Sequence, residues 1–262
     1  MIKIGGLSDQ ECEDLIAPGT ILLGYRGSIA HGMYVPKENP DSIDDKDLLG
    51  VCVPPRRFYF GLGHFEQKEK FYKEWDSVIY EARKFTRLLL NQNPNVMSLL
   101  WLDKRHYLHV SPEGQLLLDK RSLFISRKAY HSFTGYAYSQ LKRMTHFAFN
   151  GYMGDKRKQL VEKFGYDTKN AAHLIRLLRM GIEYLNEGVL YVDRGVVGDA
   201  PMLLSIKMGE WKLEQVKEEA ERLFKRAEEA YDRCKLPQID TEAIDNLTVQ
   251  IVQSALERIH GS

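Results

Sequence analysis

The sequence predicts an α+β protein, with a small mixed sheet flanked by helices and a mainly helical C-terminal part. Apolar runs at residues 21–25 and 48–53 are short and bounded by turn residues, which is typical of buried strands. From residue 126 onward, apolar residues recur at intervals of three and four, which indicates helices. We therefore expect a sheet domain over residues 1–110 and a helical domain over residues 111–262.

The sheet domain is predicted to begin with a helix over residues 8–16, because Ser8 and Glu11 have the spacing of a capping box. The two apolar strands follow. Uneven alternation then predicts another strand within residues 65–72. A helix over residues 81–91 carries apolar side chains on one face, so it is expected to cover the sheet.

The second half of the chain contains only helical patterns of any length. The predicted helices over residues 126–149, 169–186 and 213–234 each carry an apolar stripe at helical spacing, whereas the one over residues 155–164 is short and basic. Their expected ranges are residues 126–149, 155–164, 169–186, 213–234 and 240–260.

The composition is that of an ordinary soluble protein, with 44% apolar and 28% charged residues among 262. The three cysteines are scattered and show neither zinc-site spacing nor a disulfide framework, which favours a reducing compartment. No apolar stretch approaches the length of a membrane span, and the N-terminus resembles no signal peptide. These features predict a cytoplasmic protein without a membrane partner.

Positive charge is concentrated in the middle of the chain. Residues 121–180 contain 12 Lys and Arg but only 3 acidic residues, a net charge of +9, whereas the whole chain carries +1. Such an asymmetry favours a polyanionic partner, and RNA is the first candidate. A small anionic molecule or another protein remains an alternative partner for the same lysines and arginines.

Two acids precede the second apolar strand. Asp45 and Asp47 are separated by one residue, so in a strand they lie on the same face. Two carboxylates ~5 Å apart repel each other by roughly 3 kcal/mol at an effective dielectric constant near 20. A divalent cation between them would offset this repulsion, and hard oxygen ligands suit Mg²⁺. The pair is therefore a candidate metal site.

The first strand ends in Gly27 and Ser28. A glycine lets the backbone approach a ligand closely, and Ser28 can cap a short helical turn whose free N–H groups attract anions. A Gly-Ser pair after a strand carries little information alone. Followed by the Asp45–Asp47 pair, it predicts a site for a nucleotide phosphate beside a metal.

This order of features resembles the signature of the DNA polymerase β-type nucleotidyltransferase superfamily. Phrases at residues 93–96 and 165–176 are similar to the predicted nucleotidyltransferases of bacteria and phages, so the resemblance spans most of the chain. It implies a nucleotidyltransferase-like palm in the sheet domain and acceptor binding by the helical domain. It also implies an enzyme that moves a nucleoside monophosphate from a nucleoside triphosphate, such as ATP, to an acceptor hydroxyl.

The resemblance assigns roles to individual residues. Gly27 and Ser28 would bind the β- and γ-phosphates, and Asp45 and Asp47 would bind two Mg²⁺ ions, with Mn²⁺ as an alternative. A third carboxylate usually completes such a site, and Asp76, which stands before an apolar run, is our choice. Glu66 and Glu74 are its rivals, and Asp76 could instead cap the helix that follows.

Three residues of the 165–176 phrase are expected to contact the nucleotide or the acceptor. They are Lys169, His173 and Arg176, which lie on one predicted helix. Arg176 could brace a phosphate with two hydrogen bonds. For His173 alone, a packing role is an alternative. A non-catalytic nucleotide-binding protein, or an antitoxin-like regulator, is the alternative for the chain as a whole.

Overall fold

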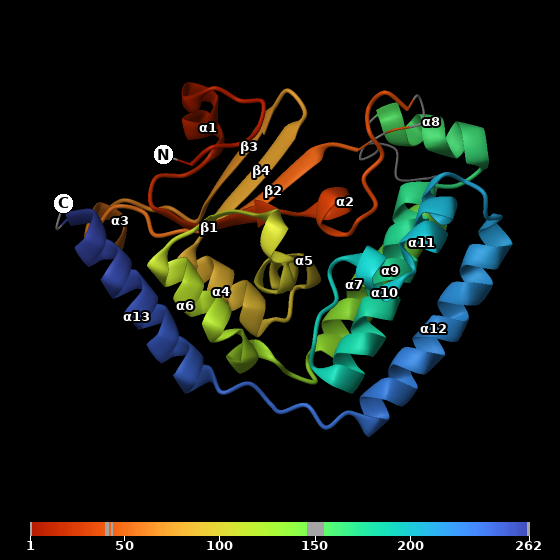
Figure 1. Cartoon of the computed structure of the whole chain (residues 1–262). Coiled ribbons are helices and arrows are strands. Elements are labelled where there is room, and N and C mark those ends of the chain that lie inside the picture. The colour runs from red at the N-terminus through yellow and green to blue at the C-terminus, as the bar shows by residue number, and fades with distance from the viewer. Residues whose placement is uncertain (1, 40–41, 43, 146–154, 261–262) are drawn as a thin grey trace. The chain divides into compact units, whose positions relative to one another are not determined.

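A computed structural model describes all residues except 1, 40–41, 43, 146–154 and 261–262 (Figure 1). The chain divides into two compact units. The first, here called the sheet unit, comprises residues 1–30, 45–125 and 238–262. The second, the helical unit, comprises residues 31–44 and 126–237. The chain therefore leaves the sheet unit and returns to it twice.

The sheet unit is built on five strands in the order β3-β4-β2-β1-β5. Strands β2 and β4 are parallel, and all other neighbours are antiparallel, so the sheet is mixed. The strands are β1 (Thr20–Tyr25), β2 (Lys46–Cys52), β3 (Gln67–Tyr72), β4 (Trp75–Glu81) and β5 (Tyr107–Val110). The predicted α+β class with a small mixed sheet is confirmed.

Helices cover both faces of this sheet. Figure 1 shows α4, α6 and α13 along one face and α1 on the other. The longer helices are α1 (Asp9–Leu15), α4 (Ala82–Leu90), α6 (Pro112–Asp119) and α13 (Thr241–His260). The single turns are α2 (Gly27–Ala30), α3 (Arg57–Phe60) and α5 (Pro94–Met97), with 3₁₀ turns at Ser98–Trp101, Lys104–His106 and Arg121–Phe124.

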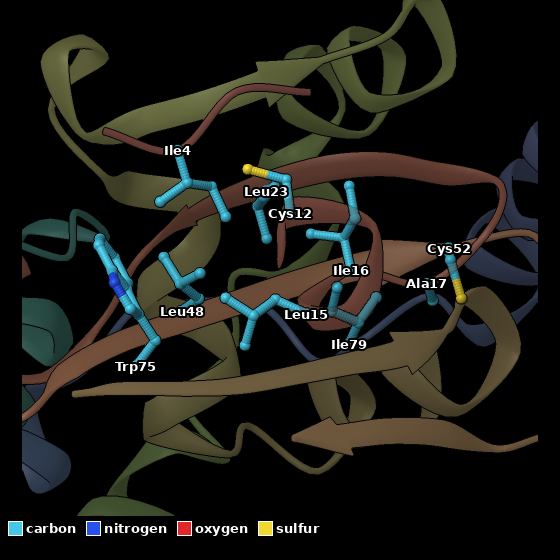
Figure 2. Packing of buried hydrophobic residues seen from close by; sticks show 10 residues of the cluster. All are labelled: Ile4, Cys12, Leu15, Ile16, Ala17, Leu23, Leu48, Cys52, Trp75 and Ile79. Carbon is cyan, nitrogen blue, oxygen red and sulfur yellow. The ribbon is translucent and has the colours of Figure 1, made fainter. Parts of the chain in front are cut away.

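The face under α1 carries a compact apolar core. The predicted capping box fixes the start of α1, because Ser8 and Glu11 each accept a hydrogen bond from the other's backbone N–H. The helix then buries Cys12 and Leu15 against the sheet, where Leu48 and the other labelled residues lie (Figure 2). Burying each large apolar side chain stabilises the fold by roughly 1.5–3 kcal/mol, so this core holds β1, β2 and β4 in place.

The helical unit is organised around α9, which packs against α7, α11 and α12. Asp167 caps α9 by accepting a hydrogen bond from the N–H of Asn170, and Gly188 ends it in the left-handed conformation. The helices are α7 (Ala129–Thr145), α8 (Asp155–Phe164), α9 (Thr168–Glu187), α10 (Arg194–Val197), α11 (Ala200–Lys207) and α12 (Leu213–Arg233). In the described part of the chain, none of the helices combines the length and apolar character needed to span a bilayer.

The two units do not follow the expected division at residue 110. Helices α6 and α13 belong to the sheet unit, although both lie after that residue in the chain. Conversely, residues 31–44 belong to the helical unit, although they lie between β1 and β2. The assignment of catalysis to residues 1–110 and of acceptor binding to residues 111–262 stays a prediction.

Candidate active site

The turn between β1 and α2 requires a glycine for two reasons. Gly27 has φ +61°, a conformation that L side chains rarely adopt, and a Cβ atom built there would overlap Oδ2 of Asp47. The hydroxyl oxygen of the next residue, Ser28, is buried and has no hydrogen-bond partner among the described residues. A buried hydroxyl without a partner is costly, so this turn offers a polar group that a ligand could satisfy.

Two carboxylates lie beside this turn. Asp47, in β2, is the direct neighbour of Asp76 across the parallel pair of strands β2 and β4. Nη2 of Arg26 lies 2.9 Å from Oδ2 of Asp76 and 3.6 Å from Oδ1 of Asp47. The side chains of Arg26 and Asp47 are each 25% exposed and that of Asp76 is 39% exposed, so solvent and a ligand can reach the group.

The other predicted acids lie differently. Asp45 immediately precedes β2 and is half-buried. Among the described residues, no three His, Cys, Asp or Glu side chains come together as a metal cluster, so Asp45 does not complete one with Asp47 and Asp76. Glu66 forms an ion pair with Lys84, with Nζ of Lys84 2.8 Å from Oε2 of Glu66.

Asp76 is the best placed of the candidates for the third carboxylate. Glu74 is paired with Lys46 at 2.6 Å, whereas Asp76 is in register with Asp47. The alternative that Asp76 caps the following helix is wrong, because Glu81 caps α4 by accepting a hydrogen bond from the N–H of Lys84. Asp76 therefore lies inside a strand.

The chemistry of this group fits a divalent cation. Mg²⁺ is bound by hard oxygen ligands and usually keeps only one or two protein carboxylates, with water and phosphate oxygens as the rest. Asp47 and Asp76 supply two such carboxylates on adjacent strands, and Arg26 at present balances their charge. Gly27 closely approaches Asp47, and the buried hydroxyl of Ser28, the next residue, finds no partner in the described part of the chain.

The nucleotide-contact candidates on α9 have partners of their own. Nη1 of Arg176 donates a hydrogen bond to Nε2 of His31 at 2.6 Å, and the Arg176 residue is only 4% exposed. Nζ of Lys169 lies 3.4 Å from Oδ1 of Asp44. His173 is half-buried on the same helix. These contacts favour an anchoring role for Arg176, and nucleotide binding by the three residues stays a prediction.

His31 is a neutral acceptor in this pair. Burial and the neighbouring charge of Arg176 hold the pKa of His31 well below its ordinary value of 6.5. Nδ1 of His31 lies 2.8 Å from the carbonyl oxygen of Val192, so Nδ1 carries the proton and donates a hydrogen bond to that oxygen. Nε2 is then free of a proton and accepts the hydrogen bond from Arg176.

Residues 16–250 of the chain match the RlaP family, described as an RNA repair pathway DNA polymerase beta family. The chain belongs to this family. It is therefore a nucleotidyltransferase, and the resemblance to the DNA polymerase β-type superfamily is confirmed. Membership of a nucleotidyltransferase family favours catalysis over the alternative of a non-catalytic protein. Nucleotidyltransferases of this superfamily are generally dependent on divalent metal ions.

A solved structure adds a distant likeness. It is the crystal structure of a nucleotidyltransferase-like protein from Exiguobacterium sibiricum 255-15, which is 12% identical to this RlaP-family chain. The comparison covers 92% of this chain and 74% of that chain, with a TM-score of 0.30. None of the curated proteins compared with the chain matches it. The family assignment rests on the match over residues 16–250.

Sequence reasoning missed two residues of this RlaP-family chain. Arg26 stands directly before Gly27, and a cation so close to an expected pair of acids could have been read as their partner. Asp44 is 1% exposed and is bound by Lys169 and Lys207. Nothing in the run of acids from Asp44 to Asp47 indicates which one is buried.

Proposed function

We propose that this enzyme transfers a nucleoside monophosphate from a nucleoside triphosphate to a hydroxyl group of RNA, with Mg²⁺ bound by Asp45 and Asp47. The observation that carries the proposal is the contact between the Gly27 turn and the carboxylate of Asp47. It brings the candidate phosphate cradle and a candidate metal ligand together. Asp76, which is in register with Asp47, is proposed as a further metal ligand or as the proton acceptor.

Each residue has a defined task in this proposal. Backbone N–H groups at the Gly27 turn and the Ser28 hydroxyl donate to the β- and γ-phosphates, which satisfies the buried hydroxyl. When bound, Mg²⁺ lowers the pKa of the acceptor hydroxyl and stabilises charge on the α-phosphate. Asp76 accepts the hydroxyl proton. Such chemistry depends on position and electrostatics rather than on a covalent enzyme intermediate.

The transfer exchanges one bond to the α-phosphorus for another. A bond forms between the acceptor oxygen and the α-phosphorus, and the bond from that phosphorus to the bridging oxygen of the β-phosphate breaks. The electron pair leaves with pyrophosphate. Lys169 and His173 on α9 are proposed to contact the nucleotide or the acceptor, since Lys169 is one third exposed and His173 is half-buried.

Two observations support RNA as the acceptor. The description of the RlaP family names an RNA repair pathway. The +9 window at residues 121–180 supplies the positive charge that RNA phosphates would require. A small molecule or a protein as the acceptor would be a different outcome of the same experiment.

The test offers each nucleoside triphosphate, labelled at the α-phosphate, to the full-length protein with total RNA, with protein extract and with small hydroxyl compounds. We expect labelled RNA, dependent on Mg²⁺ and abolished by EDTA. The Asp47→Ala variant is the negative control for contaminating enzymes. Label in protein or in a small molecule would replace RNA as the acceptor, and equal label with Asp47→Ala would refute the assigned site.

A further inference from the structure

The segment between the two sequence motifs is held by the helical unit. Residues 31–44 connect the Gly27 turn to Asp45, both of which belong to the sheet unit. The segment itself is assigned to the helical unit, and described residues near both of its ends bind α9, α10 or α11 through buried polar groups. This attachment has a direct consequence for the residues that flank the segment.

The first end is anchored through His31. Its side chain is 6% exposed, donates to the carbonyl oxygen of Val192 and accepts from Arg176. Its own carbonyl oxygen accepts a hydrogen bond from the N–H of Arg194 at 3.2 Å. At the next position, Gly32, a Cβ atom would lie 2.8 Å from Oδ1 of Asp193. The chain is therefore closely packed at His31 and Gly32, four and five residues after Gly27.

The second end is anchored through Asp44. Its carboxylate is bonded to Nζ of Lys207 and accepts a hydrogen bond from the N–H of Val35 at 2.9 Å. Lys207 is 7% exposed, and it also donates to the carbonyl oxygen of Met33 at 2.8 Å. Nζ of Lys169 adds a second positive charge 3.4 Å from Asp44. One buried lysine thus joins the beginning and the end of the segment.

We propose that Asp44 and Lys207 are positioning residues for the metal ligand Asp45. Consecutive Cα atoms are only 3.8 Å apart, so a buried and ion-paired Asp44 restricts where Asp45 can lie. Asp45 precedes the first residue of β2, whereas Asp47 lies inside that strand. This inference rests on the proposed function.

The physical argument predicts which change matters. Lys207→Met leaves the buried Asp44 with less compensating charge, and an unpaired buried carboxylate is strongly unfavourable. The carboxylate would move toward solvent and carry Asp45 with it. Lys207→Arg keeps a cation that can reach the carboxylate. The double variant Asp44→Asn with Lys207→Met removes the buried charge as well, so it should fold even if Lys207→Met does not.

The readout is the affinity of the full-length protein for Mn²⁺ alone, measured by electron paramagnetic resonance. Changes to residues that hold metal ligands in place typically cost 10–100-fold in affinity. We expect Lys207→Met and the double variant to bind Mn²⁺ at least about tenfold more weakly, and Lys207→Arg to stay within about threefold of wild type. Thermal unfolding monitors the fold of every variant.

Two controls separate the inference from its premise. Glu219→Gln breaks an ion pair of the helical unit, with Arg179 at 3.2 Å, which includes none of the described residues between 31 and 44, so Mn²⁺ affinity should not change. Asp47→Ala removes a proposed ligand. If wild type shows no Mn²⁺ site that depends on Asp47, the proposed site fails and this inference with it. If that site exists and the Lys207→Met and double variants bind Mn²⁺ like wild type, only this inference is refuted.

Discussion

Nη2 of Arg26 lies 2.9 Å from Oδ2 of Asp76, so a single guanidinium balances the charge at the candidate metal site. The same nitrogen lies 3.6 Å from Oδ1 of Asp47. A cation that occupies this position competes with a metal ion for both carboxylates. The relationship therefore links the stability of the sheet unit to metal binding.

Removing this guanidinium should increase the response to metal. In Arg26→Met, the guanidinium no longer offsets the repulsion between Asp47 and Asp76, so the metal-free protein should lose roughly 0.5–1 kcal/mol. Mg²⁺ should restore this loss, which makes the Mg²⁺-induced rise in Tm about 1–4 °C larger than in wild type. Differential scanning fluorimetry with EDTA and with Mg²⁺ measures both values.

Lys73→Met is the matched control, because Lys73 pairs with Glu11 at 2.6 Å, away from these acids. Its response to Mg²⁺ should equal that of wild type. An Arg26→Met protein with the wild-type response would contradict the prediction.

Gly27→Ala should damage the site as well as the backbone. The new alanine must adopt φ +61°, and its methyl group overlaps Oδ2 of Asp47. Gly6→Ala is the matched control, since Gly6 has φ +81° and none of the described residues comes within 4 Å of an added Cβ. Both variants should lose about 1–2 kcal/mol of unfolding free energy from backbone strain. Only Gly27→Ala should lose more, and it should also lose Mn²⁺ binding, as urea titration and paramagnetic resonance would report.

Asp47→Asn should abolish nucleotidyl transfer without unfolding the protein. The side chain is 25% exposed, so a neutral amide fits there, but it is a poor ligand for Mg²⁺. Activity should fall at least about a hundredfold, while circular dichroism stays unchanged. Asp45→Ala should behave in the same way. Glu69→Gln, an exposed carboxylate on β3, should keep full activity, and substantial turnover by Asp47→Asn would rule out its role.

The attachment of α13 to the sheet unit should depend on pH. Burial alone would raise the pKa of Glu113, but hydrogen bonds from Arg258 and Ser111 dominate and lower it from 4.5 to about 2. A lowered pKa stabilises the fold above the unfolded value, and this contribution is lost as pH falls from about 4.5 to about 2.

Glu113→Gln should therefore cost about 1–3 kcal/mol at neutral pH, less than the full shift implies because Arg258 is half exposed. The difference from wild type should shrink steadily in acid. Urea denaturation at neutral pH and near pH 3 compares the two proteins. A difference that does not change with pH would show that the ion pair does not cause it.

Local patterns predicted the elements that depend on nearby residues. The capping box of Ser8 and Glu11, the strands at residues 21–25 and 48–53 and the helices at 155–164 and 213–234 all appear within a few residues of the expected positions. The same patterns placed Gly27 and Asp47 at a strand end and a strand start. In each case, the residues that form the pattern are close together in the sequence, so their spacing alone determines which side chains share a face.

Contacts between distant residues could not be predicted from spacing. Arg258 returns to Glu113 across 145 residues, which places α13 in the sheet unit rather than in a second domain. The same separation divides Arg176 from His31, so a residue expected at a phosphate proved to have a buried imidazole as its partner. These pairs depend on tertiary packing, and nothing in either local sequence names the other member.

The composition of the sheet unit from three separate stretches of chain limits how this enzyme can be rebuilt. A cut after residue 125 would keep all five strands, but it would remove α13 and the partners of Asp44 and His31. Swapping the helical half for that of a relative would likewise need residues 31–44 to travel with it. An exchange of the helical unit between relatives would here require two coordinated crossovers, at both ends of residues 31–44, in addition to those that flank residues 126–237.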